Sequence, residues 1–210
     1  MKKGKFIVID GGDGCGKSTI IEHLKSIYTD LNKMVFTREP GGSPFAEKVR
    51  NLVLDPEAKK ASGYVHFGLI WASRADHLEK LVMPFLDAGK NVITDRFDSS
   101  TYAYQIFAQK TQNLKELFNQ VRQKYVVERC LPDLYIYLDV DPTEGIKRIN
   151  GRNGGQKNHF DEGNLEYFST VRDGYLEFIK QQKHIIVDAN QDVETVKFEV
   201  EKIIRNLISN

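Results

Sequence analysis

The strongest constraint on the fold is a glycine-rich string near the N-terminus that ends in a lysine and a serine. It matches G-x-x-x-x-G-K-[ST] at every fixed position, and it lies between an apolar run, 6–9, and apolar residues at helical spacing, 20–31. Glycines let the backbone curl so that several N–H groups face one anion, and a helix N-terminus adds its positive dipole end. The string therefore predicts a loop that binds the phosphates of a nucleotide, although the string alone does not separate kinases from GTPases or motor ATPases.

Within this loop, Lys17 is expected to reach the β- and γ-phosphates, and the Ser18 hydroxyl is expected to hold Mg²⁺. Cys15 fills a variable position, where a small side chain suffices. The predicted ATP-binding residues are Gly11, Gly12, Asp13, Gly14, Cys15, Gly16, Lys17, Ser18 and Thr19.

Size and composition narrow the classes of protein. The chain has 210 residues and a formal net charge of +1, so we expect one domain, 1–210, without a large basic surface for nucleic acid. No segment approaches the roughly 18 apolar residues of a membrane span, and the run after Lys5 is too short for a signal peptide. Two cysteines form no disulfide framework, so a reduced, cytoplasmic location is expected.

Short apolar runs alternate with helical patterns along the chain, which favours βαβ units and a parallel sheet. Helix 64–86 contains Pro84, which strains it, and Gly89 is its expected stop. We expect strands at 6–9, 34–37, 91–94, 134–138 and 185–187, and helices at 20–31, 44–54, 64–86, 101–108, 114–127, from 142 onward, 165–181 and 193–207. The fold class that follows is a three-layer α/β domain.

Further motifs are spread over nearly the whole chain: Thr37-Arg38-Glu39-Pro40-Gly41-Gly42, Ala72-Ser73-Arg74, Asp95-Arg96-Phe97, Ser100-Thr101, Ala103-Tyr104-Gln105, Pro132-Asp133-Leu134, Tyr137-Leu138-Asp139-Val140 and Val187-Asp188-Ala189. Together with the glycine-rich loop, they resemble the thymidylate kinase family in its bacterial form. The resemblance implies a P-loop NTPase fold with a five-stranded parallel sheet, transfer of the γ-phosphoryl group of MgATP to dTMP, and a homodimer.

The resemblance also implies roles at the phosphates and the sugar. Asp13 would accept a hydrogen bond from the deoxyribose 3′-hydroxyl. Arg96 would bind the acceptor phosphate, for which a guanidinium fork is suited, and Asp95 would organise Mg²⁺ and its waters. Both follow the third predicted strand, at the end where α/β sheets place ligands.

For the nucleobase, the resemblance implies that Arg74 hydrogen-bonds the thymine edge. Tyr104 would crowd the sugar C2′ and disfavour ribonucleotides, although a core tyrosine at this spacing is an equal alternative. The remaining implied substrate-binding residues are Arg38, Ile70, Ser100, Thr101 and Gln105.

A lid is expected at about 148–161, with Arg148 and Arg152 neutralising charge on the transferring phosphoryl group. Two positions depart from the family pattern. Ile70 stands where the family has a phenylalanine that stacks on thymine, with Phe67 and Trp71 nearby, and His159 stands near the lid's end where an arginine is usual.

Alternatives remain open at this point. The acceptor could be another deoxynucleoside monophosphate, or the changes at Ile70 and His159 could mark a nucleotide-binding module without catalysis. Intact Lys17, Ser18, Asp95 and Arg96 argue against the second alternative. A regulatory GTPase is disfavoured because the string Asn-Lys-x-Asp is missing.

Overall fold

A single parallel sheet organises the chain in the computed structural model, which describes residues 3–30, 32–151 and 163–209. The strand order is β2-β3-β1-β4-β5, and every neighbouring pair is parallel. The strands are β1 (Phe6–Asp10), β2 (Met34–Arg38), β3 (Asn91–Asp95), β4 (Leu134–Asp139) and β5 (His184–Asp188). Each lies within a residue or two of its predicted position, so the predicted α/β fold class is confirmed.

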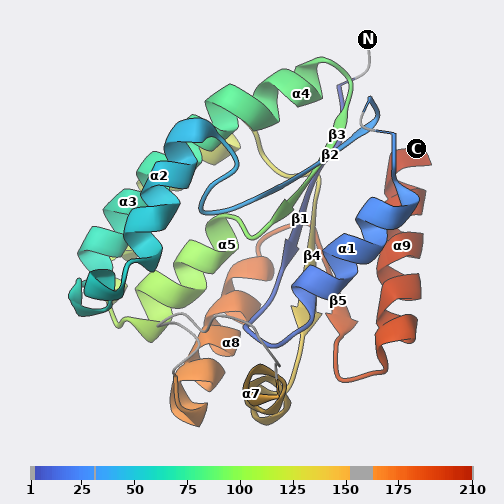
Figure 1. Cartoon of the computed structure of the whole chain (residues 1–210). Helices are drawn as coiled ribbons and strands as arrows, with labels where there is room; N and C mark the ends of the chain where they lie inside the picture. Colours follow the sequence, from blue (N-terminus) through green and yellow to red (C-terminus); the bar gives the residue numbers. More distant parts are fainter. Residues whose placement is uncertain (1–2, 31, 152–162, 210) are drawn as a thin grey trace.

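The central strand β1 is buried on both faces, which explains why its sequence shows no polar alternation. Phe6 and Val8 belong to the hydrophobic core on one face, whereas Ile7 and Ile9 belong to the core on the other. Helices α1 (Lys17–Ile27) and α9 (Val193–Ser209) cover the second face (Figure 1). The sheet is thus the middle of three layers.

The first face is covered by α3 (Gly63–His77), α5 (Asp98–Thr101) and α8 (Leu165–Ile179), and α2 (Pro44–Leu54) packs outside them against α3 (Figure 1). The other helical segments are η1 (Pro56–Lys60), α4 (Met83–Asp87), η4 (Gln112–Leu114), α6 (Lys115–Arg122) and α7 (Pro142–Asn150). None of the helices described is both long and apolar enough for a membrane crossing.

Three segments predicted as uniform helices contain wider, π-helical turns. One of them, η2 (Leu78–Val82), separates α3 from α4 just before Pro84, the residue expected to strain this helix. A second, η3 (Tyr102–Ala108), continues α5, and the third, η5 (Gln123–Val127), continues α6. Such turns are frequent at functional sites, and η3 holds the predicted substrate residues Tyr104 and Gln105.

Candidate active site

The glycine-rich loop connects β1 to α1 at the carboxyl edge of the sheet. Gly14 and Gly16 adopt φ angles of 83° and 92°, in the left-handed region that favours glycine. Lys17 is buried, and its Nζ donates to the carbonyl oxygens of Gly11 (2.8 Å) and Gly12 (3.1 Å). Gly16 makes no side-chain cap, so the first N–H groups of α1 are available to an anion in the loop.

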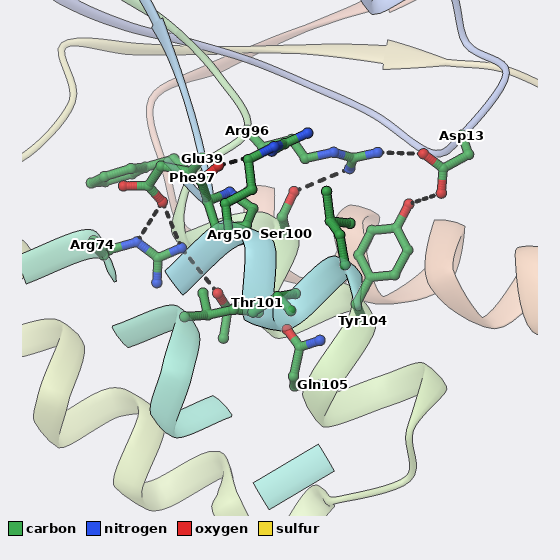
Figure 2. A pocket seen from close by; sticks show the side chains of 14 residues that line it. Asp13, Glu39, Arg50, Arg74, Arg96, Phe97, Ser100, Thr101, Tyr104 and Gln105 are labelled. Carbon is green, nitrogen blue, oxygen red and sulfur yellow. Dashed lines mark hydrogen bonds and ion pairs between the residues drawn. The ribbon is translucent and has the colours of Figure 1, made fainter. Parts of the chain in front are cut away.

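A pocket of about 120 Å³ opens beside this loop, and Figure 2 shows the side chains that line it. Three segments that are far apart in the sequence form it. The first connects β1 to α1, the second runs from the end of β2 through α3, and the third runs from the end of β3 through η3. The lining residues are Asp13, Glu39, Pro40, Arg50, Val53, Leu54, Ile70, Arg74, Arg96, Phe97, Ser100, Thr101, Tyr104 and Gln105. Most of the predicted substrate-binding residues therefore meet in one pocket.

Arg96 lies at the junction between the loop and the pocket, with a φ of 68° that is uncommon for a residue with a side chain. Its Nη1 donates to the hydroxyls of Tyr175 (2.9 Å) and Ser100 (3.3 Å), and its Nη2 donates to the Asp13 carboxylate. Burial disfavours the charged form, but Tyr104 and Asp13 hold the pKa of Arg96 above its ordinary value. The guanidinium is therefore a permanent cation held in place.

Below Arg96 lies a buried network that the sequence analysis did not find. Asp10 ends β1 and accepts hydrogen bonds from Tyr175 (2.7 Å), Ser99 (2.6 Å) and Ser100 (2.9 Å). Burial and the charge of Asp10 raise the pKa of Tyr175. An acid at the end of a buried strand is a local signal for Asp10, whereas Tyr175 comes from α8 and has no comparable signal.

Tyr104 reaches into the pocket from η3 and donates from its hydroxyl to Asp13 Oδ2 at 2.6 Å. Burial is the main cause that raises the pKa of Tyr104, so the hydroxyl keeps its proton and acts as a donor. Tyr104 is only 6% exposed and belongs to the hydrophobic core as well. Tyr104 thus lines the pocket and packs in the core, and its implied role at the sugar C2′ stays a prediction.

The far end of the pocket contains a buried ion pair between Arg74 and Glu39. Arg74 Nε donates to Glu39 Oε2 at 2.8 Å, and Nη2 donates to Thr101 Oγ1 at 3.0 Å (Figure 2). The guanidinium also lies over the Trp71 ring, 4.5 Å from its centroid. Nη1 is buried and has no hydrogen-bond partner, so Arg74 offers one unused donor in the pocket.

The aromatic rings near the position of the family phenylalanine differ in whether they reach the pocket. Ile70 lines the pocket, as the resemblance implied. Phe67 and Trp71 instead belong to the hydrophobic core and do not line it. Phe97, named above only as part of a motif, also lines the pocket, but the Arg74 guanidinium already lies 5.2 Å from its ring centroid.

Two arginines near the pocket differ in position. Arg38 is exposed, pairs with Glu47 at 3.1 Å, and does not line the pocket. Arg50, on α2, does line it and donates to the carbonyl oxygen of Pro40 at 2.8 Å. Burial and the charge of Arg38 lower the pKa of Arg50. The pocket thus receives Arg50, which the sequence analysis missed, in place of Arg38.

On the other side of the loop, a cleft is lined by Cys15, Gly16 and Thr19 together with residues that precede and begin α9. Arg148 also lines this cleft, where it donates to Glu144 (2.9 Å) and to the carbonyl oxygen of Ala189 (2.8 Å). Most of the predicted lid, with Arg152 and His159, lies outside the described residues.

The two residues predicted to hold Mg²⁺, Asp95 and Ser18, differ in burial. Asp95 ends β3, and its Oδ1 is buried without a hydrogen-bond partner, while Ser18 is exposed in the first turn of α1. Within the described ranges, no group of three His, Cys, Asp or Glu residues could hold a metal ion. Magnesium in nucleotide sites is bound by one or two carboxylates, phosphates and waters, and an orphan carboxylate oxygen fits that chemistry.

A phosphate-binding loop, an adjacent pocket rich in arginine and a parallel sheet with helices on both faces define a P-loop nucleotide kinase. Comparisons with known proteins agree. The family model described as Thymidylate kinase matches residues 9–200. The chain belongs to the thymidylate kinase family, and it is an ATP-dependent nucleoside monophosphate kinase.

Relatives and a solved structure support the same assignment. The chain is 36% identical over 200 residues to the thymidylate kinase of Hahella chejuensis, covering 94% of both chains. It is 38% identical over 202 residues to that of Mycoplasma capricolum, covering 95% of this chain and 93% of the relative. The crystal structure of thymidylate kinase from Ehrlichia chaffeensis matches with a TM-score of 0.74 and 30% identity, over 97% of this chain and 99% of that one.

Proposed function

We propose that this enzyme transfers the γ-phosphoryl group of MgATP to dTMP, which gives dTDP and ADP. The observation that carries this proposal is the unused donor at Arg74 Nη1, buried in a pocket that also contains Arg96. A buried N–H without a partner favours a carbonyl oxygen, which the thymine edge supplies. Arg96, next to the loop, suits the phosphate of the same acceptor.

The proposed chemistry consists of positioning and charge neutralisation, since phosphoryl transfer needs little covalent help from the protein. The loop and Lys17 bind the phosphates of ATP, and Arg96 holds the acceptor phosphate in line with the γ-phosphate. Asp95 and Ser18 would hold Mg²⁺, which when bound neutralises charge on the phosphate oxygens. The support is that Lys17 and Arg96 both donate to the Gly11 carbonyl oxygen of the loop, and that Asp95, with its orphan oxygen, ends β3 beside Ile9 of β1.

We also propose a homodimer. Its support, besides family membership, is a group of half-exposed apolar side chains on the adjacent helices α2 and α3: Phe45, Leu52, Tyr64 and Val65. Exposed apolar side chains on two packed helices are suited to an interaction surface. Leu52→Glu should convert the dimer to a monomer in analytical ultracentrifugation.

A reduced, cytoplasmic location is proposed as well, because both cysteines are free thiols.

The test is a coupled ADP-release assay with dTMP, dUMP, dCMP and dGMP as acceptors. The highest kcat/KM should be with dTMP, and Lys17→Ala should lower kcat about 10²–10³-fold by removing a donor to transition-state charge. A higher kcat/KM with another monophosphate would reassign the acceptor. ADP release that does not depend on any monophosphate would overturn the proposal.

A further inference from the structure

A row of polar side chains, buried except for the half-buried Thr37, runs from β2 to the acceptor pocket. Thr37 Oγ1 lies 2.8 Å from His77 Nε2, and His77 Nδ1 lies 3.0 Å from Glu39 Oε1. The other oxygen of Glu39 accepts from Arg74 at 2.8 Å. The side chains of His77, Glu39 and Arg74 are 0%, 3% and 1% exposed. Because a carboxylate only accepts, His77 Nδ1 carries a proton whichever state the ring is in.

This arrangement fixes the carboxylate from both sides. A carboxylate held only by Arg74 could rotate about its last side-chain bond, but the imidazole N–H holds the second oxygen. The ring itself is confined, since a Cβ added to Gly42 would lie 2.6 Å from His77 Cδ2. With Nε bound to Glu39 and Nη2 bound to Thr101, the direction of Arg74 Nη1 is determined.

We propose that His77 is a positioning residue for recognition of the acceptor base, acting through Glu39 on Arg74. The inference rests on the proposed function and deepens it. Loss of the Nδ1–H donor frees the Glu39 carboxylate, so that Arg74 Nη1 loses its direction. A misaligned Nη1 donor weakens binding of a base with a keto group, as in dTMP. A base with an amino group at the same position, as in dCMP, places a donor against this donor, and the misalignment relieves that repulsion. His77 thereby helps the pocket to distinguish dTMP from dCMP.

The experiment compares His77→Leu with His77→Asn, whose amide N–H reaches a position close to that of imidazole Nδ1. We expect His77→Leu to raise the KM for dTMP about tenfold and to narrow the ratio of kcat/KM for dTMP over dCMP by a similar factor. The kcat and the KM for ATP should stay within about twofold. His77→Asn should recover most of the loss, and Thr37→Val should give a smaller loss of the same kind.

The matched control is His23→Leu, which breaks another histidine–glutamate pair, between α1 and α9. In this pair His23 Nε2 lies 3.3 Å from Glu201. The variant should leave unchanged the KM for dTMP, the kcat, the KM for ATP and the ratio of kcat/KM for dTMP over dCMP. Equal losses in His77→Leu and His77→Asn, or a lower Tm and kcat with an unchanged dTMP-to-dCMP ratio, would overturn the inference. If His77→Leu does not fold, Thr37→Val tests the inference in its place. A higher KM for dTMP in Thr37→Val supports the inference, and an unchanged KM overturns it. Wild-type enzyme without activity on dTMP would overturn the proposed function itself.

Discussion

The guanidinium of Arg96 donates to the carboxylate of Asp13, an acid inside the phosphate-binding loop. A carboxylate at that place would repel the phosphates of a nucleotide. The ion pair neutralises this charge, and the Tyr104 hydroxyl binds the second oxygen at 2.6 Å. Asp13 is thereby kept in the loop as an acceptor while Arg96 is aimed at the space between loop and pocket, where the two phosphates must meet.

Arg96→Lys should therefore be severe even though it keeps the positive charge. An ammonium cannot bind Asp13, Tyr175 and a phosphate in the fixed fork of a guanidinium. Steady-state kinetics should show a higher KM for dTMP and a kcat lower by roughly 10- to 100-fold, with the KM for ATP little changed. A loss confined to ATP affinity would mean that Arg96 serves the donor nucleotide instead.

Arg50 and Arg38 form a matched pair for testing which cation serves the pocket. Arg50 lines the pocket, whereas the exposed Arg38 is bound to Glu47. We expect Arg50→Ala to raise the KM for dTMP about tenfold, since a half-buried cation near Arg96 attracts an anionic substrate more strongly than an exposed one. Arg38→Ala should change it less than threefold, as exposed ion pairs contribute little. The reverse order would restore Arg38 as the substrate-binding residue.

Tyr104 combines two functions that two substitutions separate. Tyr104→Phe removes the hydrogen bond to Asp13 but keeps the ring, while Tyr104→Ala removes both. If ring bulk excludes the ribose 2′-hydroxyl, the ratio of kcat/KM for dTMP over its ribonucleotide should be preserved in Tyr104→Phe and should fall in Tyr104→Ala. An unchanged ratio in both, with a lower Tm in Tyr104→Ala, would leave Tyr104 as a core residue.

How much the sequence could predict depends on whether the interaction is local. The loop at 11–18 was predictable because its chemistry needs neighbouring residues in fixed order, and the strands were predictable because burial on both faces leaves continuous apolar runs. Asp10 and Tyr175 are 165 residues apart, so only the packing of α8 reveals their hydrogen bond. The contact between His77 and Glu39 likewise joins α3 to the end of β2.

The π-helical turns are another difference from the sequence-based expectation. A helical period of 3.6 residues does not reveal a wider turn, so the sequence predicts ordinary helix at η3, although its residues Tyr104 and Gln105 line the pocket as predicted. Arg38 and Arg50 show that the sequence also does not reveal the direction of a helix. Both are basic residues near the same motif, and only the direction of α2 relative to the pocket decides that Arg50 enters it.

Cys130 makes stability depend on pH in the alkaline range. Burial raises the pKa of its thiol to about 11, from an ordinary value of 9.0. Between these values the unfolded thiol loses its proton while the folded thiol keeps it, so the free energy of unfolding falls as pH rises. Urea unfolding at pH 8, 9, 10 and 11 should show a steeper fall for the wild type than for Cys130→Ala. Parallel curves would assign the fall to buried tyrosines such as Tyr135.

The last prediction concerns Ile70, which lines the pocket where the family phenylalanine stacks on thymine. An aliphatic side chain offers contact area without a π-face, and base stacking on an aromatic ring contributes about 1–3 kcal/mol. The Phe97 ring does not replace it, because Arg74 lies over that ring. We therefore expect Ile70→Phe to lower the KM for dTMP about fivefold, which is roughly 1 kcal/mol, with ATP kinetics unchanged.

Ile70→Leu is the matched control for this change, since it keeps the volume and adds no ring, and its KM for dTMP should equal that of the wild type. Overpacking against Val49 and Val53, the neighbours of Ile70 in its hydrophobic cluster, could cost about 1–3 kcal/mol and hide the gain. Thermal unfolding separates the two effects, because overpacking lowers Tm whereas stacking acts only when the nucleotide is bound. A normal Tm with an unchanged or higher KM in Ile70→Phe would show that the base does not lie against Ile70.

Phe67→Ala, a core change outside the pocket, should lower Tm and leave the dTMP KM within about twofold. A sharp rise in that KM would place the stacking ring at Phe67 instead.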